Sequence, residues 1–322
     1  MESRKVKQPT EILDAGRTAA ALPYTALVAA LARVAHELNN GLLCVPERQV
    51  VEVDATSTLL CMPAIGHDLG ITKIVTVHRG NDAYALPTIQ GEVIVFDAKS
   101  GQRLVLLDGP TVTARRTAAI TLLAIDTLVP NRPRSALLIG TGVQAREHVQ
   151  ALLEYMDIRL FWIAGRTYRR AAEFAQTLST TGSSFTPIAI ADIPPEGLGS
   201  DVVIALTTAQ WPVIPVKLAP ETLAIGVGAF RPDMAELPPD LLRLRRVVVD
   251  NLQGAKREAG DLIQAALDWS QVSDLAQMLD GACSREHLPT AFKSVGHASW
   301  DLAAARVAVR HLDLSGSRDL PG

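Results

Sequence analysis

The stretch LLIGTGVQAREHVQAL, residues 137–152, runs from a short apolar segment through two glycines into a helical pattern. A strand, a tight turn and a helix in this order leave the first N–H groups of the helix open to an anion such as a nucleotide pyrophosphate. Gly140 and Gly142 alone are weak support, because any tight connection uses glycine. The context in the rest of the chain therefore decides between the two interpretations.

The region after the proline-rich segment 129–135 alternates short apolar runs with helical or polar stretches. This alternation predicts a doubly wound parallel sheet that is covered on both faces. The glycine turn follows the first run, at the place where such folds bind dinucleotides. Gly140 then permits the turn, Gly142 lets the phosphates approach the backbone, and Ala145 allows close packing of helix and strand. The six runs are ALLIG, RLFWIAG, FTPIAIA, DVVIAL, TLAIGVG and RRVVVD.

The first third of the chain has a different pattern. Between residues 48 and 108, β-rich runs follow one another with turn residues between them and no helical spacing. This pattern predicts an antiparallel sheet with a hairpin tip at 97–103. Helical spacing predicts one helix over the sheet at 25–41 and a second helix at 113–129. The first third is thus an α+β module.

The expected fold class is α/β, with a doubly wound parallel-sheet domain at 126–297 and an α+β domain at 1–125. The segment 292–312 also has helical spacing. We expect it to leave the second domain and to pack on the first, which a C-terminal helix at 298–322 would join. The α+β domain is the expected substrate-binding and dimerisation domain.

Composition excludes several classes of partner. A chain of 322 residues, 48% of them apolar, can bury the cores of two domains. A net charge of −3 offers no basic face for nucleic acid, and no apolar run reaches the roughly 18 residues of a membrane span. The N-terminus is charged and is no secretory signal. We therefore expect a cytoplasmic protein with a small-molecule partner and neither a nucleic-acid nor a membrane partner.

The cysteines and histidines give no sign of a metal site. Cys44, Cys61 and Cys283 are an odd number without Cys-x-x-Cys spacing, which argues against a disulfide framework and against zinc. We expect them to be buried free thiols. The histidines have no ligand-like spacing. We predict no metal.

The end of the second apolar run discriminates between nicotinamide cofactors. A carboxylate there accepts hydrogen bonds from the ribose of NAD, but this chain reads Ala164-Gly165-Arg166-Thr167. The guanidinium of Arg166 and the hydroxyl of Thr167 suit a 2′-phosphate. NADPH is therefore favoured and NADH stays possible, because a solvated basic helix start would have the same residues.

Four motifs together resemble the ornithine cyclodeaminase/mu-crystallin family: IGTGVQA at 139–145, RTAA at 116–119, EAGDL at 258–262 and FKSVGHASWDLAAA at 292–305. The resemblance spans about residues 46–310. It implies a Rossmann dinucleotide-binding domain beside an α+β domain that dimerises, in a family of cyclodeaminases, alanine dehydrogenases and cyclic ketimine reductases. We expect a homodimer, also because the strands of the antiparallel sheet are unusually apolar for a surface module.

The resemblance implies that Arg48, Lys73 and Arg116 face the substrate and the cofactor. A guanidinium can grip a carboxylate in two places, and an ammonium near a C=N bond can move a proton. Lys73 precedes an alternating, largely apolar strand, where an inward ammonium is costly to bury alone. We therefore expect the substrate carboxylate to join it. For a lone lysine or arginine, the alternative is a surface salt bridge.

One departure from the family pattern bears on the reaction. Cyclodeaminases carry an aspartate after a glycine turn, where this chain has Phe230. A phenyl ring cannot accept a proton, so a reductase is favoured over a cyclodeaminase. The segment KSVGHASWDLAAA resembles the bacterial Δ1-pyrroline-2-carboxylate/Δ1-piperideine-2-carboxylate reductase branch. This implies reduction of a small cyclic imino acid to L-proline or L-pipecolate.

His297 and Asp301 are four residues apart on a predicted helix and so are placed on one face, where they are candidates to supply or relay the proton. The alternative is a surface pair or a helix cap.

The catalytic candidates are Lys73, His297 and Asp301. The substrate-binding candidates are Arg48, Lys73 and Arg116. The cofactor-binding candidates are Arg116, Gly140, Thr141, Gly142, Val143, Gln144, Gly165, Arg166, Thr167, Thr207, Val227, Gly228 and Phe230.

Three other functions stay open at this point. The first is an alanine-dehydrogenase-like enzyme that uses free ammonia. The second is an ornithine-cyclodeaminase-like enzyme, and the third is a non-catalytic NADPH-binding protein of the mu-crystallin type.

Overall fold

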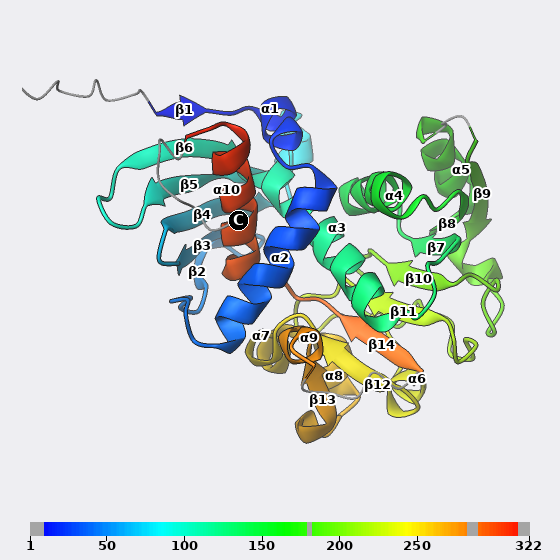
Figure 1. The fold of residues 1–322 in the computed structure, drawn as a ribbon. Coiled ribbons are helices and arrows are strands. Elements are labelled where there is room, and N and C mark those ends of the chain that lie inside the picture. The colour runs from blue at the N-terminus through cyan, green and yellow to red at the C-terminus, as the bar shows by residue number, and fades with distance from the viewer. Residues whose placement is uncertain (1–9, 179–181, 282–288, 315–322) are drawn as a thin grey trace, which may run out of the picture. The chain divides into compact units, whose positions relative to one another are not determined.

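The chain divides into two compact units, and the computed structural model describes residues 10–178, 182–281 and 289–314 of it (Figure 1). Within the described residues, the first unit comprises residues 10–30, 40–116 and 298–314, and the second comprises residues 31–39 and 117–297. Two long helices contribute residues to both units: α2 (Tyr24–Asn39) and α3 (Gly109–Leu128).

The first unit is built on a six-stranded sheet in the order β1-β6-β5-β4-β3-β2. The predicted antiparallel sheet is confirmed, because each strand from β2 to β6 pairs antiparallel with the next. The short strand β1 (Glu11–Ile12) joins the edge in parallel beside β6, and α1 (Ala15–Ala20) follows it. The antiparallel strands are β2 (Gln49–Asp54), β3 (Ser57–Ile65), β4 (Leu69–His78), β5 (Ile89–Asp97) and β6 (Arg103–Asp108); η1 (Asn81–Tyr84) lies between β4 and β5.

The two faces of this sheet have different surroundings. Side chains alternate along β4, so Ile71, Lys73 and Val75 are buried while Ile74 on the opposite face is 38% exposed. The helix α10 (Ala298–His311) lies against β3, β4 and β5 (Figure 1). Because Lys73 reaches Asp301 of α10, α10 covers the face to which Lys73 belongs. The opposite face, which carries Ile74 and Val51, is the more exposed one among the described residues of this unit.

The second unit contains an eight-stranded sheet in the order β13-β12-β14-β11-β10-β7-β8-β9, and every pair in it is parallel. The predicted doubly wound parallel sheet is therefore confirmed. Its strands are β7 (Ser135–Ile139), β8 (Leu160–Gly165), β9 (Ser184–Ala189), β10 (Val202–Ala205), β11 (Leu223–Gly226), β12 (Arg246–Val249), β13 (Val272–Asp274) and β14 (Thr290–Lys293). The connections contain α4 (Val143–Met156), α5 (Tyr168–Thr177), η2 (Ile190–Asp192), α6 (Pro239–Arg243), α7 (Leu252–Glu258), α8 (Gly260–Gln264), η3 (Trp269–Gln271) and α9 (Leu275–Leu279).

The central strands are apolar because both of their faces are covered. Every residue of β7, β10 and β11 is buried. The chain passes from β7 to β8 on one side and later returns to β10 on the other, so the strand order reverses at β7. In sheets of this kind, ligands bind beyond the carboxyl ends of the strands at this switch point.

Two strands of the second unit were missed by the sequence prediction. The start of the C-terminal helix at residue 298 is confirmed, because α10 begins at Ala298; the helical spacing assigned to the segment from residue 292 is wrong at its start, where Thr290–Lys293 is the fully buried strand β14. Gly296, with φ +82°, breaks the chain direction between the two elements. Both the strand and the helix are apolar, so their spacing reads as one helix. The three-residue strand β13 was also missed.

The expectations from composition can be compared with the described residues. The prediction of buried thiols is wrong for Cys44, which is exposed, and Cys61 is only partly buried; Cys283 lies outside the described residues. No helix in residues 10–178, 182–281 or 289–314 is long and apolar enough to span a membrane. In the same ranges, no group of three histidine, cysteine or acidic residues is arranged to hold a metal ion.

An ion pair fastens α10 to the sheet of the first unit. The guanidinium of Arg306 donates to both carboxylate oxygens of Asp68, with distances from 2.7 to 3.1 Å. Burial of Asp68 opposes its ionisation, but the hydrogen bonds and charge of Arg306 outweigh this and hold the pKa of the carboxyl below its usual value. The pair therefore stabilises the fold at pH values where the unfolded carboxyl is also ionised.

We predict that Asp68→Asn lowers the free energy of unfolding by about 1.5–3 kcal/mol at pH 7, because charge-assisted hydrogen bonds are lost. The folded pKa of Asp68 is depressed, so its contribution is lost as the pH falls through that pKa. Urea titrations should show the difference from wild type shrinking between pH 6 and pH 3. In Glu11→Gln, which removes the exposed partner of Arg17, the change should stay within about 1 kcal/mol. An equal loss at all pH values would contradict the prediction.

Candidate functional site

The glycine turn of residues 140–142 joins β7 to α4 and is tightly packed on one side. Gly140 has φ +132°, a conformation that residues with a side chain rarely adopt. A Cβ atom on Gly140 would lie 2.6 Å from the backbone oxygen of Leu206, the residue after β10. Gly140 is therefore required by its backbone angle and by the close approach of the neighbouring loop.

Gly142 is glycine for a different reason. It caps α4 with an ordinary φ of −97°, and it offers no side chain to the first N–H groups of this 14-residue helix. A Cβ atom on Gly142 would meet no atom within 4 Å. Free N–H groups at a helix start beside open space suit a pyrophosphate. Thr141, Val143 and Gln144 belong to this turn and to the first turn of α4, so the predicted phosphate contacts are grouped together.

The end of β8 carries the residues expected to choose between cofactors. Gly165 ends β8, and a Cβ atom on it would lie 2.9 Å from the backbone nitrogen of Ala171, so it allows α5 to pack closely. Arg166 is exposed. The hydroxyl of Thr167 already accepts from the N–H of Arg170, at 3.3 Å, as the cap of α5. Arg169 is paired with Glu173 at 2.8 Å, so Arg166 is the better placed of the two for an anion.

The loops after β10 and β11 are in backbone contact with each other. A Cβ atom on Gly228 would overlap the backbone oxygen of Thr207. Thr207 follows β10, which is adjacent to β7, and Gly228 follows β11, the next strand in the sheet, so both lie at the same end of the parallel strands as the glycine turn. Of the two other candidates in these loops, Val227 is buried and Phe230 is 46% exposed. Phe230 is the one whose side chain is accessible to a ligand.

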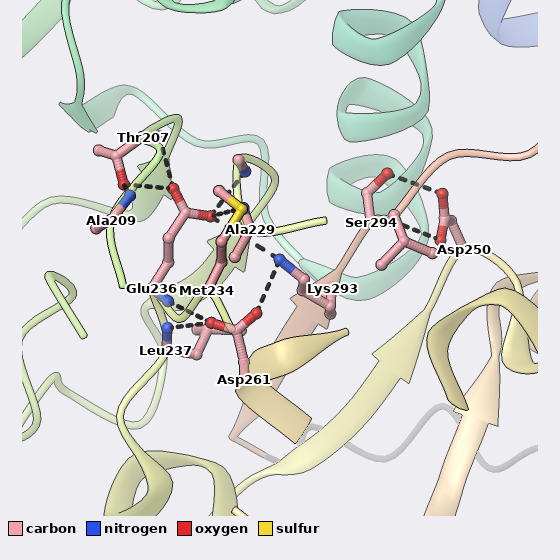
Figure 2. A network of polar contacts seen from close by, with 12 residues as sticks. Thr207, Ala209, Ala229, Met234, Glu236, Leu237, Asp250, Asp261, Lys293 and Ser294 are labelled. Carbon is pink, nitrogen blue, oxygen red and sulfur yellow. Dashed lines mark hydrogen bonds and ion pairs between the residues drawn. The ribbon is translucent and has the colours of Figure 1, made fainter. Parts of the chain in front are cut away.

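A buried charged cluster beside these loops was missed by the sequence prediction. Glu236, Asp261 and Lys293, whose charged groups point toward one another in Figure 2, are each at most 1% exposed. The ammonium of Lys293 lies 2.8 Å from Asp261 Oδ2 and 3.9 Å from Glu236 Oε2. A sequence signal was available, because all three lie in the motifs VGAFRPDMAEL, EAGDL and TAFKSV. Charged residues inside such apolar segments need partners.

The first unit contains a second buried charged cluster, around Lys73. The ammonium of Lys73 lies 2.8 Å from Asp301 Oδ2 and 3.4 Å from the hydroxyl of Thr113, which accepts from it. Arg116 Nε on α3 lies 3.4 Å from Asp301 Oδ1. All three charged side chains are at most 6% exposed. The structure therefore brings together Lys73, Arg116 and Asp301 from among the predicted site residues.

The charge balance of this cluster corrects one expectation. The anion beside Lys73 was expected to be the substrate, but the protein itself supplies Asp301. Burial lowers the pKa of Lys73 to about 8; the charge of Asp301 opposes this shift, and the charges of Arg116 and Arg48 add to it. Lys73 and Arg116 share this carboxylate, so positive charge exceeds negative charge within the trio. Because its pKa is about 8, Lys73 can exchange a proton near neutral pH.

The expectation for His297 is also corrected. His297 is partly buried and lies one residue before α10, in the second unit, whereas Asp301 lies in the first turn of that helix. His297 and Asp301 are four residues apart in the sequence, but they do not share a face of α10, because His297 lies outside the helix. The segment before His297 is held by the buried carboxylate of Asp250, which accepts from the Ser294 hydroxyl at 2.8 Å and from the N–H groups of Val295 and Gly296 (Figure 2).

Comparisons with known proteins agree on one family. The pattern of the ornithine cyclodeaminase/mu-crystallin family matches residues 10–313. A Δ1-pyrroline-2-carboxylate reductase of Burkholderia multivorans is 45% identical over 93% of this chain and 95% of its own length. A Δ1-pyrroline-2-carboxylate/Δ1-piperideine-2-carboxylate reductase of Azospirillum brasilense is 43% identical over the same shares.

A solved structure with a similar fold extends the comparison. The Δ1-pyrroline-2-carboxylate reductase of Thermococcus litoralis, solved with NADH and L-proline, superposes with a TM-score of 0.85 at 26% identity. The match covers 97% of this chain and 100% of the archaeal chain. The family pattern, the bacterial relatives and this fold coincide over nearly the whole sequence, and the chain belongs to the ornithine cyclodeaminase/mu-crystallin family.

Proposed function

We propose that the protein is an NAD(P)H-dependent reductase of a small cyclic imino acid, Δ1-pyrroline-2-carboxylate or Δ1-piperideine-2-carboxylate, and that it forms L-proline or L-pipecolate. The observation that carries the proposal is the buried trio Lys73, Asp301 and Arg116, with an exchangeable proton and an excess of positive charge. Such a substrate has one carboxylate to bind and one ring nitrogen to protonate. The names of the bacterial relatives support the same reaction.

The residues of the first unit divide this work between them. Arg116 and Arg48 provide guanidinium groups for the substrate carboxylate. Lys73 donates a proton to the ring nitrogen, and Asp301 holds the ammonium in place and stabilises its charged form until the proton leaves. His297, which precedes α10, remains a second candidate for relaying the proton.

The residues of the second unit would hold the cofactor. NAD(P)H, when bound, supplies the hydride that is added to C2 of the C=N bond. The N–H groups at the start of α4 would bind its pyrophosphate, and Arg166 would bind a 2′-phosphate, which favours NADPH over NADH. We place the enzyme in the cytoplasm, where both nucleotides are supplied.

A turnover assay tests the function. We expect the purified protein to oxidise NADPH when a cyclic imino acid is added alone. Turnover that requires ammonium and pyruvate would indicate an alanine-dehydrogenase-like enzyme instead. NADPH binding without turnover of any of these compounds would indicate a non-catalytic binding protein.

We also propose a homodimer that forms through the more exposed face of the first unit's sheet. On this face, Ile74 lies opposite Cys61, and Val51 lies opposite Leu59 in the neighbouring pair of strands. Val51 and Ile74 are 45% and 38% exposed, although both are apolar. A second copy of the same face would remove this surface from water.

Arg166→Asp should weaken NADPH binding far more than NADH binding. Loss of one charge-assisted contact is worth roughly 1.5–3 kcal/mol, and the new carboxylate repels the 2′-phosphate. Fluorescence titration with each nucleotide measures the two dissociation constants. An equal loss for both nucleotides would mean that Arg166 does not contact the 2′-phosphate.

Lys73→Ala should lower kcat/KM at least tenfold, or about 1.4 kcal/mol of transition-state stabilisation, while NADPH affinity stays within about twofold. Lys73→Arg should not restore full activity, because a guanidinium does not release a proton near neutral pH. In the wild type, kcat/KM should fall as the pH rises through about 8, since only the ammonium form of Lys73 donates. Lys99→Ala, at the exposed hairpin tip of the same unit, is the control. Full activity of Lys73→Ala would show that Lys73 is a structural lysine.

Ile74→Glu should convert the dimer to monomers, because a two-fold interface places the new carboxylates in an apolar contact. Light scattering at micromolar concentration measures the mass. Leu244→Glu, at a position 79% exposed in the second unit, should leave the dimer intact. A wild-type monomer at this concentration would refute the proposed assembly.

A further inference from the structure

Glu236 lies in the interior of the second unit with its carboxylate turned toward the loops that follow β10 and β11 (Figure 2). Its Oε1 accepts from the N–H and the hydroxyl of Thr207, at 2.6 and 2.9 Å. Its Oε2 accepts from the N–H groups of Gly228 and Ala229, at 2.7 and 3.0 Å. One carboxylate thus binds both loops at once.

The backbone of Glu236 adds further connections. Its carbonyl oxygen accepts from the N–H groups of Val213 and Ile214, at 3.0 Å each. Its own N–H donates to Asp261 Oδ1, and Asp261 also accepts from the N–H of Leu237 at 2.8 Å. Glu236 therefore joins the loop after β10, the loop after β11 and the helix α8.

Two neighbouring charges act on the carboxylate of Glu236 in opposite directions. Burial raises the pKa of Glu236; Lys293 acts against this rise, and Asp261 adds to it. Lys293 lies between the two carboxylates, closer to Asp261. A buried cluster of ions is a poor source of stability compared with apolar packing of the same volume. The carboxylate of Glu236 accepts from three backbone N–H groups, and this geometry suits it to hold the two loops in fixed positions.

The two loops border the turn that we assign to the cofactor. The backbone oxygen of Leu206, the residue before Thr207, leaves no room for a side chain on Gly140. Thr207 is also in backbone contact with Gly228, in the loop after β11. A shift of Thr207 would therefore be transmitted both to the glycine turn and to the loop after β11.

We propose that Glu236 is a positioning residue for the nicotinamide cofactor, which it serves by holding Thr207 and Gly228 beside the glycine turn, with Lys293 favouring its ionised form and Asp261 holding its backbone and Lys293 in place. This inference rests on the proposed function, since it requires that the second unit binds NAD(P)H. Both carboxylate oxygens of Glu236 already accept from Thr207, Gly228 and Ala229, so the role that we propose for it is exerted through these loops. Its effect on the cofactor is thus indirect.

The test uses Glu236→Gln, which keeps the shape of the side chain. All four groups that meet the carboxylate are hydrogen-bond donors, three of them backbone N–H groups that cannot turn into acceptors. An amide must place its own NH2 group against one pair of them, whichever way it is flipped. The hydrogen bonds to Thr207 or to Gly228 and Ala229 are therefore lost.

We expect Glu236→Gln to raise the dissociation constant of NADPH at least fivefold in a fluorescence titration without substrate. The KM for NADPH should rise by a similar factor, while the KM for the cyclic imino acid stays within about twofold. The control is Asp201→Asn. Asp201 accepts from two backbone N–H groups and a serine hydroxyl near the start of β7. This contact lies at the amino-terminal ends of the strands, away from the glycine turn at their carboxyl ends. This variant should lose thermal stability but keep the wild-type affinity for NADPH.

Thr207→Val and Thr207→Ser provide a second measurement if Glu236→Gln does not fold. Valine removes the hydroxyl that donates to Glu236, and serine keeps it. Valine should weaken NADPH binding and serine should restore it. An unchanged affinity in Glu236→Gln, or equal affinities in both Thr207 variants, would overturn the positioning role. A wild-type protein that binds neither NADPH nor NADH would overturn the proposed function itself, and this inference with it.

Discussion

Each unit of this protein buries a lysine, and each must supply a carboxylate to neutralise it. Lys73 meets Asp301 in the first unit and Lys293 meets Asp261 in the second, both at 2.8 Å. Removing an unpaired ion from water is costly by several kcal/mol, so each lysine is buried beside a carboxylate. The partner of Lys73 comes from the other end of the chain. The antiparallel sheet and the C-terminal helix α10 are therefore joined by a buried ion pair, and the pair Asp68–Arg306 fastens the same two elements.

The two clusters differ in the sign of their excess charge, and this difference matches the work that we propose for them. In the first unit, Lys73 and Arg116 lie around one carboxylate, and the excess positive charge suits an anionic substrate. In the second, Glu236 and Asp261 lie around one ammonium. The excess negative charge there is bound by backbone N–H groups of the loops at the carboxyl edge of the sheet. Ions that are expensive to bury are thus placed where we propose that they bind a ligand or fix a loop.

Structural features that depend on neighbouring residues in the sequence were predicted well, and features that depend on distant residues were not. The turn at Gly140 and the alternation of short strands with helices are local signals, and both were confirmed. The strand β14 was mistaken for the start of a helix, because its four residues and the following helix are equally apolar. His297 was placed on that helix for the same reason. The thiols of Cys44 and Cys61 were expected to be buried, but Cys44 is exposed, and Cys61 lies on the partly exposed face of the sheet that carries Ile74.

The sequence by itself determined the fold class, the glycine turn after the first strand of the parallel sheet and the family, since these depend on period, glycine position and motifs within a few dozen residues. The tertiary structure alone decided which charges meet. The sequence identified Lys73 as costly to bury, but it did not show that Asp301 neutralises it in place of the substrate. It contained Glu236, Asp261 and Lys293 in three separate motifs without indicating that they share one site. The physical reason is that electrostatic partners are selected by distance in space, and separation along the chain does not specify that distance.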